Sequence, residues 1–110
     1  MLVDTAFTVR AKQAMTYKFS ADSKGGRVRG RFRATGGSGN DIEVYILDKD
    51  GYENWQNGHK VRTYYNSGRI TVADIDVTLG QGKYILVFSN RFSSITPKAV
   101  EAQVSLTWED

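Results

Sequence analysis

A segment near the middle of the chain combines aromatic, amide and cationic side chains of the kind that bind carbohydrates or peptides. Trp55, Asn57 and His59 lie in one short stretch, and Tyr64 and Arg69 follow. Aromatic rings stack on flat ligand faces, while amide and cationic groups hydrogen-bond at the edges of a ligand. We therefore expect these residues to line a ligand surface. Alternatively, Trp55 and one tyrosine fold back to cap the open end of the domain.

A second candidate is a row of arginines. In the segment RVRGRFRA, residues 27–34, every second residue is an arginine: Arg27, Arg29, Arg31 and Arg33. Side chains alternate between the two faces of a strand, so a strand collects all of these arginines on one face, whereas a helix would scatter them. A basic row of this kind can bind phosphates, anionic glycans or an acidic protein partner through bidentate contacts.

The same row also has a purely structural interpretation. It is then a solvated sheet face, and carboxylates on neighbouring strands relieve the repulsion between the arginines. Asp74, Asp76 and Glu101 lie on the outward faces of other predicted strands and are the candidates for this role. Nucleic acid is not an expected partner, because aromatic residues do not interleave with the arginine row to stack on bases.

The residue types that catalysis or metal binding requires are scarce. His59 is the only histidine and there is no cysteine, so the sequence predicts no multi-histidine metal site, no thiolate nucleophile and no Ser/His/Asp triad. Asp48-Lys49-Asp50-Gly51 is similar to the start of a calcium loop, but the twelfth position of an EF-hand would be His59 instead of glutamate. A calcium-stabilised, carbohydrate-binding jelly roll, with Asp41, Asp48 and Asp50 around one ion, is the alternative. We otherwise expect no catalytic residues, no metal, no cofactor and no enzymatic activity.

The composition is that of an ordinary globular domain. The chain has 110 residues, of which 40% are hydrophobic and 25% charged, and its net charge is +3. A chain of this length builds one core, so we expect a single domain over residues 1–110. No apolar run approaches the length of about 20 residues that spans a bilayer. Residues 1–20 lack the apolar core of a signal peptide, because Arg10, Lys12 and Gln13 interrupt it.

The dominant sequence period is two, which predicts β-strands. Residues 27–34 and 100–108 alternate cleanly, with Trp108 expected to point inward, and shorter alternating segments lie between residues 7 and 19. Residues 84–88 are apolar on both faces, so this strand is expected in the middle of a sheet and covered on both sides. About eight strands without a convincing amphipathic helix predict an all-β fold, an antiparallel β-sandwich or jelly roll.

The expected connections between these strands are short. Residues 52–60 are predicted to be a loop, and residues 61–65 a strand. Residues 70–79 are predicted to form one strand, in which a shift of the alternation indicates a bend near Ala73. Gly51 is expected to take a positive φ, and the turn at Gly80-Gln81-Gly82 is expected to close a hairpin. The predicted turns are Gly36-Gly37-Ser38-Gly39-Asn40, Asp48-Lys49-Asp50-Gly51, Asn66-Ser67-Gly68 and Gly80-Gln81-Gly82.

The C-terminal part of the chain resembles a known family. The segment YILVFSNRFSSITPKAVEAQVSLTW, residues 84–108, is similar to the closing strands of the GOLD (Golgi dynamics) domain, in which G-x-Y-x-F-x-F-x-N-x-F-S precedes T-x-K-x-V. Upstream, Asp41-Ile42 and Asp50-Gly51 resemble the family's D-I-x-V…D-x-D-G hairpin. The similarity covers residues 25–108. The matching positions are Gly82, Tyr84, Phe88, Asn90, Phe92, Ser93, Thr96, Lys98 and Val100.

The resemblance implies a GOLD-like β-sandwich that binds a partner and is not an enzyme. It implies a protein or glycan partner or a lipid surface, and it favours an extracytoplasmic location, either periplasmic, secreted or lumenal. The paired cysteines, the coiled coil and the membrane anchor of the early-secretory-pathway cargo receptors are absent from this sequence, which indicates a bacterial-type relative or an isolated module. We therefore predict a non-catalytic binding module for protein, glycan or lipid-surface recognition. The alternative is a structural domain that self-associates.

Overall fold

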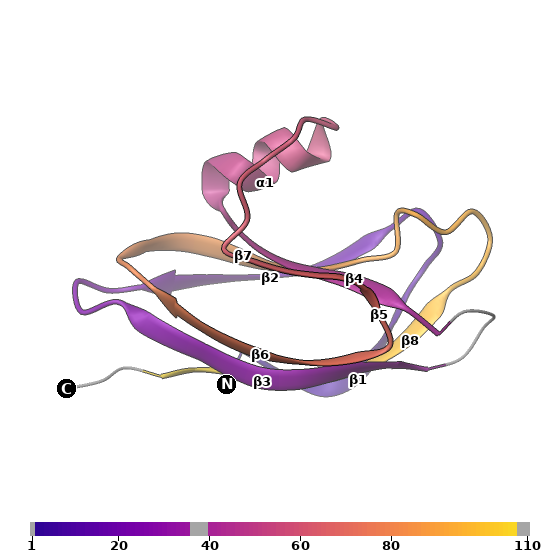
Figure 1. The fold of residues 1–110 in the computed structure, drawn as a ribbon, viewed down its shortest axis with the longest axis horizontal. Coiled ribbons are helices and arrows are strands. Elements are labelled where there is room, and N and C mark those ends of the chain that lie inside the picture. The colour runs from indigo at the N-terminus through magenta and orange to yellow at the C-terminus, as the bar shows by residue number, and fades with distance from the viewer. Residues whose placement is uncertain (1, 36–39, 108–110) are drawn as a thin grey trace.

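The computed structural model describes residues 2–35 and 40–107. In this part of the chain eight strands form two antiparallel sheets of four strands each, which pack face to face with one short helix outside them (Figure 1). The predicted all-β antiparallel sandwich is therefore confirmed. Most of the predicted turn at 36–40, and Trp108, lie outside the described residues. The elements are β1 (Val3–Val9), β2 (Ala14–Ala21), β3 (Gly26–Thr35), β4 (Ile42–Asp48), α1 (Lys49–Gln56), β5 (Tyr65–Ile70), β6 (Val72–Leu79), β7 (Gly82–Ser89) and β8 (Lys98–Thr107).

The strand order is that of a jelly roll. Sheet A has the order β1-β8-β3-β6, and sheet B has the order β2-β7-β4-β5. The chain changes sheets at every connection except the one from β4 to β5, as in double-sheet jelly rolls. The turn at Gly80-Gln81-Gly82 thus joins β6 of sheet A to β7 of sheet B, and the prediction of a hairpin there is wrong.

The core lies between the two sheets and is filled by alternate side chains of each strand. Phe88 of β7 is fully buried, and its ring packs against Phe7, Tyr17 and Phe32 with ring centroids 5.1–6.1 Å apart. Each fully buried side chain of this size contributes about 1.5–3 kcal/mol to stability. On β3, Val28, Phe32 and Ala34 point inward, which confirms the face assigned from the alternation.

Strand β7 lies between β2 and β4 and is covered on both sides, as its sequence predicts. The outer cover is α1, which Figure 1 shows outside sheet B. Leu47, Ile85 and Val87 point outward from the sheet and are buried beneath Tyr52 and Trp55 of the helix. Within the described residues, no helix is long and apolar enough to cross a membrane.

The helix replaces a predicted turn and most of a predicted loop. The Oδ1 of Asp48 accepts a hydrogen bond from the backbone N–H of Gly51 (2.6 Å), which caps the first turn of α1. Gly51 is helical and does not take the expected positive φ. A Cβ at this position would lie 2.9 Å from the Asp48 Oδ1, so glycine leaves room for the cap. The Asp and Gly that suggested a turn therefore begin a helix.

Residues 61–79 also differ from the prediction. Strand β5 starts at Tyr65, and residues 61–64 are not a strand. The predicted turn at Asn66-Ser67-Gly68 lies inside β5 at an irregularity, where the Ser67 Oγ accepts the Val44 N–H at 2.9 Å. The predicted single strand over 70–79 is two strands, because the chain passes from sheet B to sheet A at Thr71. This change of sheet explains the shift in alternation better than a bend at Ala73.

Candidate functional site

The outward-pointing side chains of sheet A, which we call the sheet A face, bring the arginine row next to carboxylates. Arg27 makes two 2.8 Å contacts with Asp76, and the Arg31 Nε lies 2.8 Å from the Asp74 Oδ1. The arginine beside each of these carboxyls lowers its pKa from the usual range by hydrogen bonding. The carboxylate partners expected on a neighbouring strand are thus present for Arg27 and Arg31. The face consists of Asp4, Arg27, Arg29, Arg31, Arg33, Val72, Asp74, Asp76, Glu101, Gln103 and Ser105.

These two ion pairs predict a specific loss of stability in acid. The folded state lowers the pKa values of Asp74 and Asp76. Their contribution to the free energy of unfolding is therefore fully present above the ordinary Asp pKa of about 4, and it is lost as the pH falls through the lowered pKa values. Asp74→Asn combined with Asp76→Asn should therefore flatten the fall of the urea midpoint between about pH 5 and pH 2. Asp22→Asn, in the turn after β2, is the control. An equally steep fall in the double variant would contradict the assignment.

The other two arginines of the row have no ion pair among the described residues. Arg29 lies opposite Asp76 in the strand register, but that carboxylate is held by Arg27. Arg33 lies opposite Val72 of β6 on one side and Glu101 of β8 on the other. Strand β6 therefore places no carboxylate opposite Arg33. No ion pair of 4 Å or less joins Arg33 to Glu101 in the described structure. On the sheet A face, Arg29, Arg33 and Glu101 can therefore bond to another molecule.

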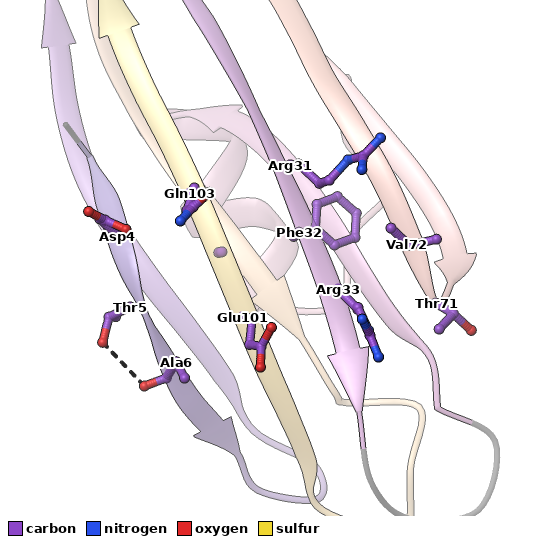
Figure 2. Close-up of a pocket in the computed structure, with 11 residues that line it drawn as sticks. Asp4, Thr5, Ala6, Arg31, Phe32, Arg33, Thr71, Val72, Glu101 and Gln103 are labelled. Carbon is purple, nitrogen blue, oxygen red and sulfur yellow. Dashed lines mark hydrogen bonds between the residues drawn. The ribbon is translucent and has the colours of Figure 1, made fainter.

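Two neighbouring hollows give the sheet A face its shape. Figure 2 shows the larger one, where Arg31 and Arg33 extend from β3, Glu101 and Gln103 stand on β8, and Asp4 stands on β1. Its volume is about 670 Å³. The second, of about 540 Å³, shares Arg31 and Gln103 with the first and continues along the strands. Together they form an extended polar groove along β3 and β8.

The groove offers hydrogen bonding, charge and aliphatic surface, but its described residues present no aromatic ring. Among the described residues, no aromatic ring points outward from sheet A; Phe32 lies beneath the groove and its side chain is fully buried. Of the described residues that line the groove, Val72 is the one large aliphatic side chain that is strongly exposed, at 46%. This surface is therefore unsuited to ligands that bind by stacking on an aromatic ring, such as nucleobases.

The predicted loop site lies elsewhere, at the end of α1 and beyond it. Trp55 is half-buried beneath the Arg91 guanidinium, which lies 4.6 Å from the centre of its ring. Trp55 and Tyr52 do fold back, but they cover the outer face of sheet B and not the open end of the sandwich. The side chain of Asn57 donates to the Glu53 carbonyl (3.0 Å), while His59 is exposed.

The remaining two predicted residues are separated from these and from each other. The Tyr64 hydroxyl donates to the Asp48 Oδ2 at 3.3 Å, near the start of α1. Arg69 pairs with Glu43 at 3.1 Å, at the opposite end of β4, and stacks on Phe92. Trp55, Asn57 and His59 are thus neighbours, whereas Tyr64 and Arg69 lie in two different contact networks.

The carboxylates of the calcium alternative do not converge. Asp41 precedes β4 and pairs with Lys98 at 2.9 Å, whereas Asp48 ends β4 and caps α1. A strand of this length separates its ends by about 20 Å. Among the described residues, no three Asp, Glu or His side chains lie close enough together to hold a metal ion. A shared ion at Asp41, Asp48 and Asp50 is therefore incompatible with this fold.

Comparison of the sequence with protein-family models and with the curated proteins finds no match. We therefore infer function from the fold and from the chemistry of the sheet A face.

Proposed function

We propose that this chain is a non-catalytic binding module that holds an acidic oligosaccharide along the sheet A face. The observation that carries the proposal is the polar groove formed by the two hollows that meet at Arg31 and Gln103. Hollows of about 300–1,000 Å³ are typical of ligand sites, and this pair has the elongated form that suits a chain of linked sugars.

The side chains along the groove suit a ligand rich in hydroxyl groups. Arg33 supplies N–H donors, Glu101 supplies acceptors, and the amide of Gln103 supplies both. These planar groups stand on adjacent β-strands, whose register fixes their spacing. A rigid sheet also reduces the entropy that is lost on binding.

The arginines that make no ion pair favour a ligand that carries carboxylates. Arg29 and Arg33 have no ion pair among the described residues and are four positions apart on one strand, which corresponds to about 13 Å. Arg31, between them, is held in place by Asp74. Acidic groups spaced along a ligand can bond to the outer arginines while hydroxyls bond to Glu101 and Asp4.

Isothermal titration with a galacturonic acid tetrasaccharide tests this function, with the neutral maltotetraose as the comparison ligand. Arg33→Ala should weaken binding of the acidic sugar about tenfold or more, because a hydrogen bond to a charged group is worth about 1.5–3 kcal/mol. Arg62→Ala, an exposed arginine away from the groove, is the matched control and should leave affinity unchanged. Equal binding of both sugars, or an unchanged affinity in the Arg33 variant, would contradict the proposal.

Self-association through the same face is the second candidate. Arg29 and Arg33 lack ion pairs within the described chain, and so do Asp4 and Glu101. A two-fold axis can bring the cations of one copy onto the carboxylates of another, since such an interface must be complementary to itself. Sedimentation over a concentration series separates the candidates: a monomer at high concentration excludes self-assembly, and a dimer that Arg33→Ala dissociates supports it.

We further propose that the chain is a bacterial-type relative of the GOLD domains. The resembling segment consists of β7, the loop after it and β8. Its polar positions hold that loop together: Asn90 bonds to the Val9 and Thr96 carbonyls, and Lys98 is buried beside Asp41. These contacts support a structural role for the motif, with the ligand bound elsewhere on the sandwich.

A further inference from the structure

A separate hollow lies on the outside of sheet B, beside α1. Its volume is about 510 Å³. Figure 1 shows α1 on the opposite side of the sandwich from sheet A, so this site is independent of the proposed sugar groove. We call it the lysine groove, and its main lining residues are Lys18, Lys49, Lys83, Tyr52, Gln56 and Ile85.

The groove concentrates positive charge. Lys18 belongs to β2, Lys83 to β7 and Lys49 to the first turn of α1, so three distant parts of the chain each contribute a lysine to the lining. Glu53 is the one carboxylate among the lining residues, and none of the three lysines makes an ion pair within the described chain. Like charges that are brought together without partners repel one another, and a bound anion relieves that repulsion.

One wall of the groove is aromatic and carries a free proton donor. The Tyr52 hydroxyl accepts a hydrogen bond from the Gln56 amide at 2.9 Å, so its own hydrogen remains available to an anion. The Tyr52 ring is stacked on Trp55, which fixes its position. The exposed Ser20 also lines the groove, and Ile85, Phe19 and Tyr84 form its nearly fully buried floor, at 5–8% exposure.

We propose that the lysine groove binds a small anionic ligand that carries one ring, such as an aryl phosphate. The ammonium groups and the Tyr52 hydroxyl bond to the anion, and the ring of the ligand lies against the Tyr52 ring. The volume of the groove suits a compact molecule of this kind. This inference goes beyond the sugar-binding function and does not depend on it.

Phenyl phosphate is the probe that tests the lysine groove, titrated into the isotope-labelled chain and followed by NMR. Inorganic phosphate tests the anion alone, and benzyl alcohol tests the ring alone. Phenyl phosphate should bind more tightly than either, weaken with added salt and shift the signals of Tyr52, Lys83 and Ile85. Equal affinity for phenyl phosphate and inorganic phosphate would overturn the proposal, and so would the absence of any saturable shift.

Single substitutions in the lysine groove should change the affinity for phenyl phosphate in opposite directions, according to the charge that they remove. Lys49→Ala and Lys83→Ala should each weaken phenyl phosphate binding about two- to fivefold, the range of exposed ion pairs. Glu53→Gln should tighten it, because the substitution removes the one carboxylate of the lining. Lys60→Ala, an exposed lysine outside the groove, is the matched control. If Lys60→Ala weakens binding as much as Lys49→Ala does, the anion is attracted by net charge and the proposed site is wrong.

Two further measurements test whether the variants are folded and whether the lysine groove is independent of the sugar groove. Near-ultraviolet circular dichroism of each variant should match that of the unaltered chain, because these lysines are exposed and no hydrogen bond to their side chains is found in the described structure. Binding of the galacturonic acid tetrasaccharide should stay unchanged in Lys49→Ala. Loss of sugar binding in that variant would show that the two sites are coupled and would overturn the independence of the lysine groove.

Discussion

Gly30→Ala should destabilise the protein by about 3 kcal/mol or more, at the upper end of what overpacking a core costs. Gly30 lies in the middle of β3, opposite Val104 of β8. A Cβ at this position would lie 2.1 Å from the Gln103 carbonyl oxygen and 2.6 Å from the Val104 Cα. Both are backbone atoms of a paired central strand, so neither can move without shifting the sheet. The expected result is a large drop in the urea midpoint.

The matched control is Gly80→Ala, in the turn between β6 and β7. A Cβ there meets nothing within 4 Å, so stability should stay unchanged or rise slightly as the unfolded chain loses freedom. Gly30 also lines the second hollow of the sheet A face, between Arg29 and Arg31. Gly30→Ala should weaken sugar binding as well, because a shift of β8 against β3 moves Gln103 relative to Arg31. A variant as stable as the unaltered chain would show that β3 and β8 do not approach this closely.

Asn90→Ala is the second substitution with a large expected effect, a loss of about 1–3 kcal/mol. Asn90 is fully buried, and its amide donates to the carbonyls of Val9 (3.1 Å) and Thr96 (2.8 Å). Its backbone pairs with the segment that joins β1 to β2, through Lys12 and Gln13. Truncation to alanine leaves the buried Val9 carbonyl without this donor, at a cost of about 1–3 kcal/mol. The half-buried Thr96 carbonyl loses one donor but still accepts from the Ser93 hydroxyl at 3.0 Å.

Ser94→Ala is the control for Asn90, because Ser94 is exposed in the same loop and makes no side-chain hydrogen bond in the described structure. Urea titrations followed by tryptophan fluorescence should show a lower midpoint for Asn90→Ala only. Equal midpoints for the two variants would mean that the Asn90 bonds contribute nothing to stability. Sugar binding below the transition should persist in Asn90→Ala, since this residue lies away from the sheet A face.

The strands were predictable because the alternation of polar and apolar residues that indicates a strand lies within a few neighbouring residues. In residues 27–34 each inward position is Val, Gly, Phe or Ala and each outward position is Arg, and only a strand separates two such sets. The apolar run at 84–88 likewise required cover on both sides, and the structure provides it with the core on one face and α1 on the other. Asp74 and Asp76 were also identified as partners of the arginines, because alternation placed them on an outward face.

The helix was missed because its cap has the composition of a turn. Asp48 and Gly51 occur in β-turns and at helix starts alike, and what distinguishes them here is the Asp48 hydrogen bond to Gly51. The spacing of Tyr52 and Trp55 by three residues is a helical signal, but two aromatic residues among polar ones are too few to show a period.

The candidate sites depend on contacts between distant segments, which a single sequence does not reveal. Lys18, Lys49 and Lys83 are far apart along the chain, and only the pairing of β2 with β7 and the position of α1 bring them together. In the same way, Arg33 and Glu101 become neighbours through the pairing of β3 with β8. The change of sheet at Thr71 escaped prediction because the exposed Ile70 and Val72 continue an apolar pattern across it.

The most direct test of the binding function is to map the galacturonic acid tetrasaccharide on the isotope-labelled chain by NMR. The proposal predicts saturable shifts at backbone amides of the groove, above all Arg33, Glu101 and Gln103, with little change in sheet B. Shifts confined to α1 and sheet B, or no saturable shift with any acidic sugar, would contradict the assignment of the sheet A face as the ligand site.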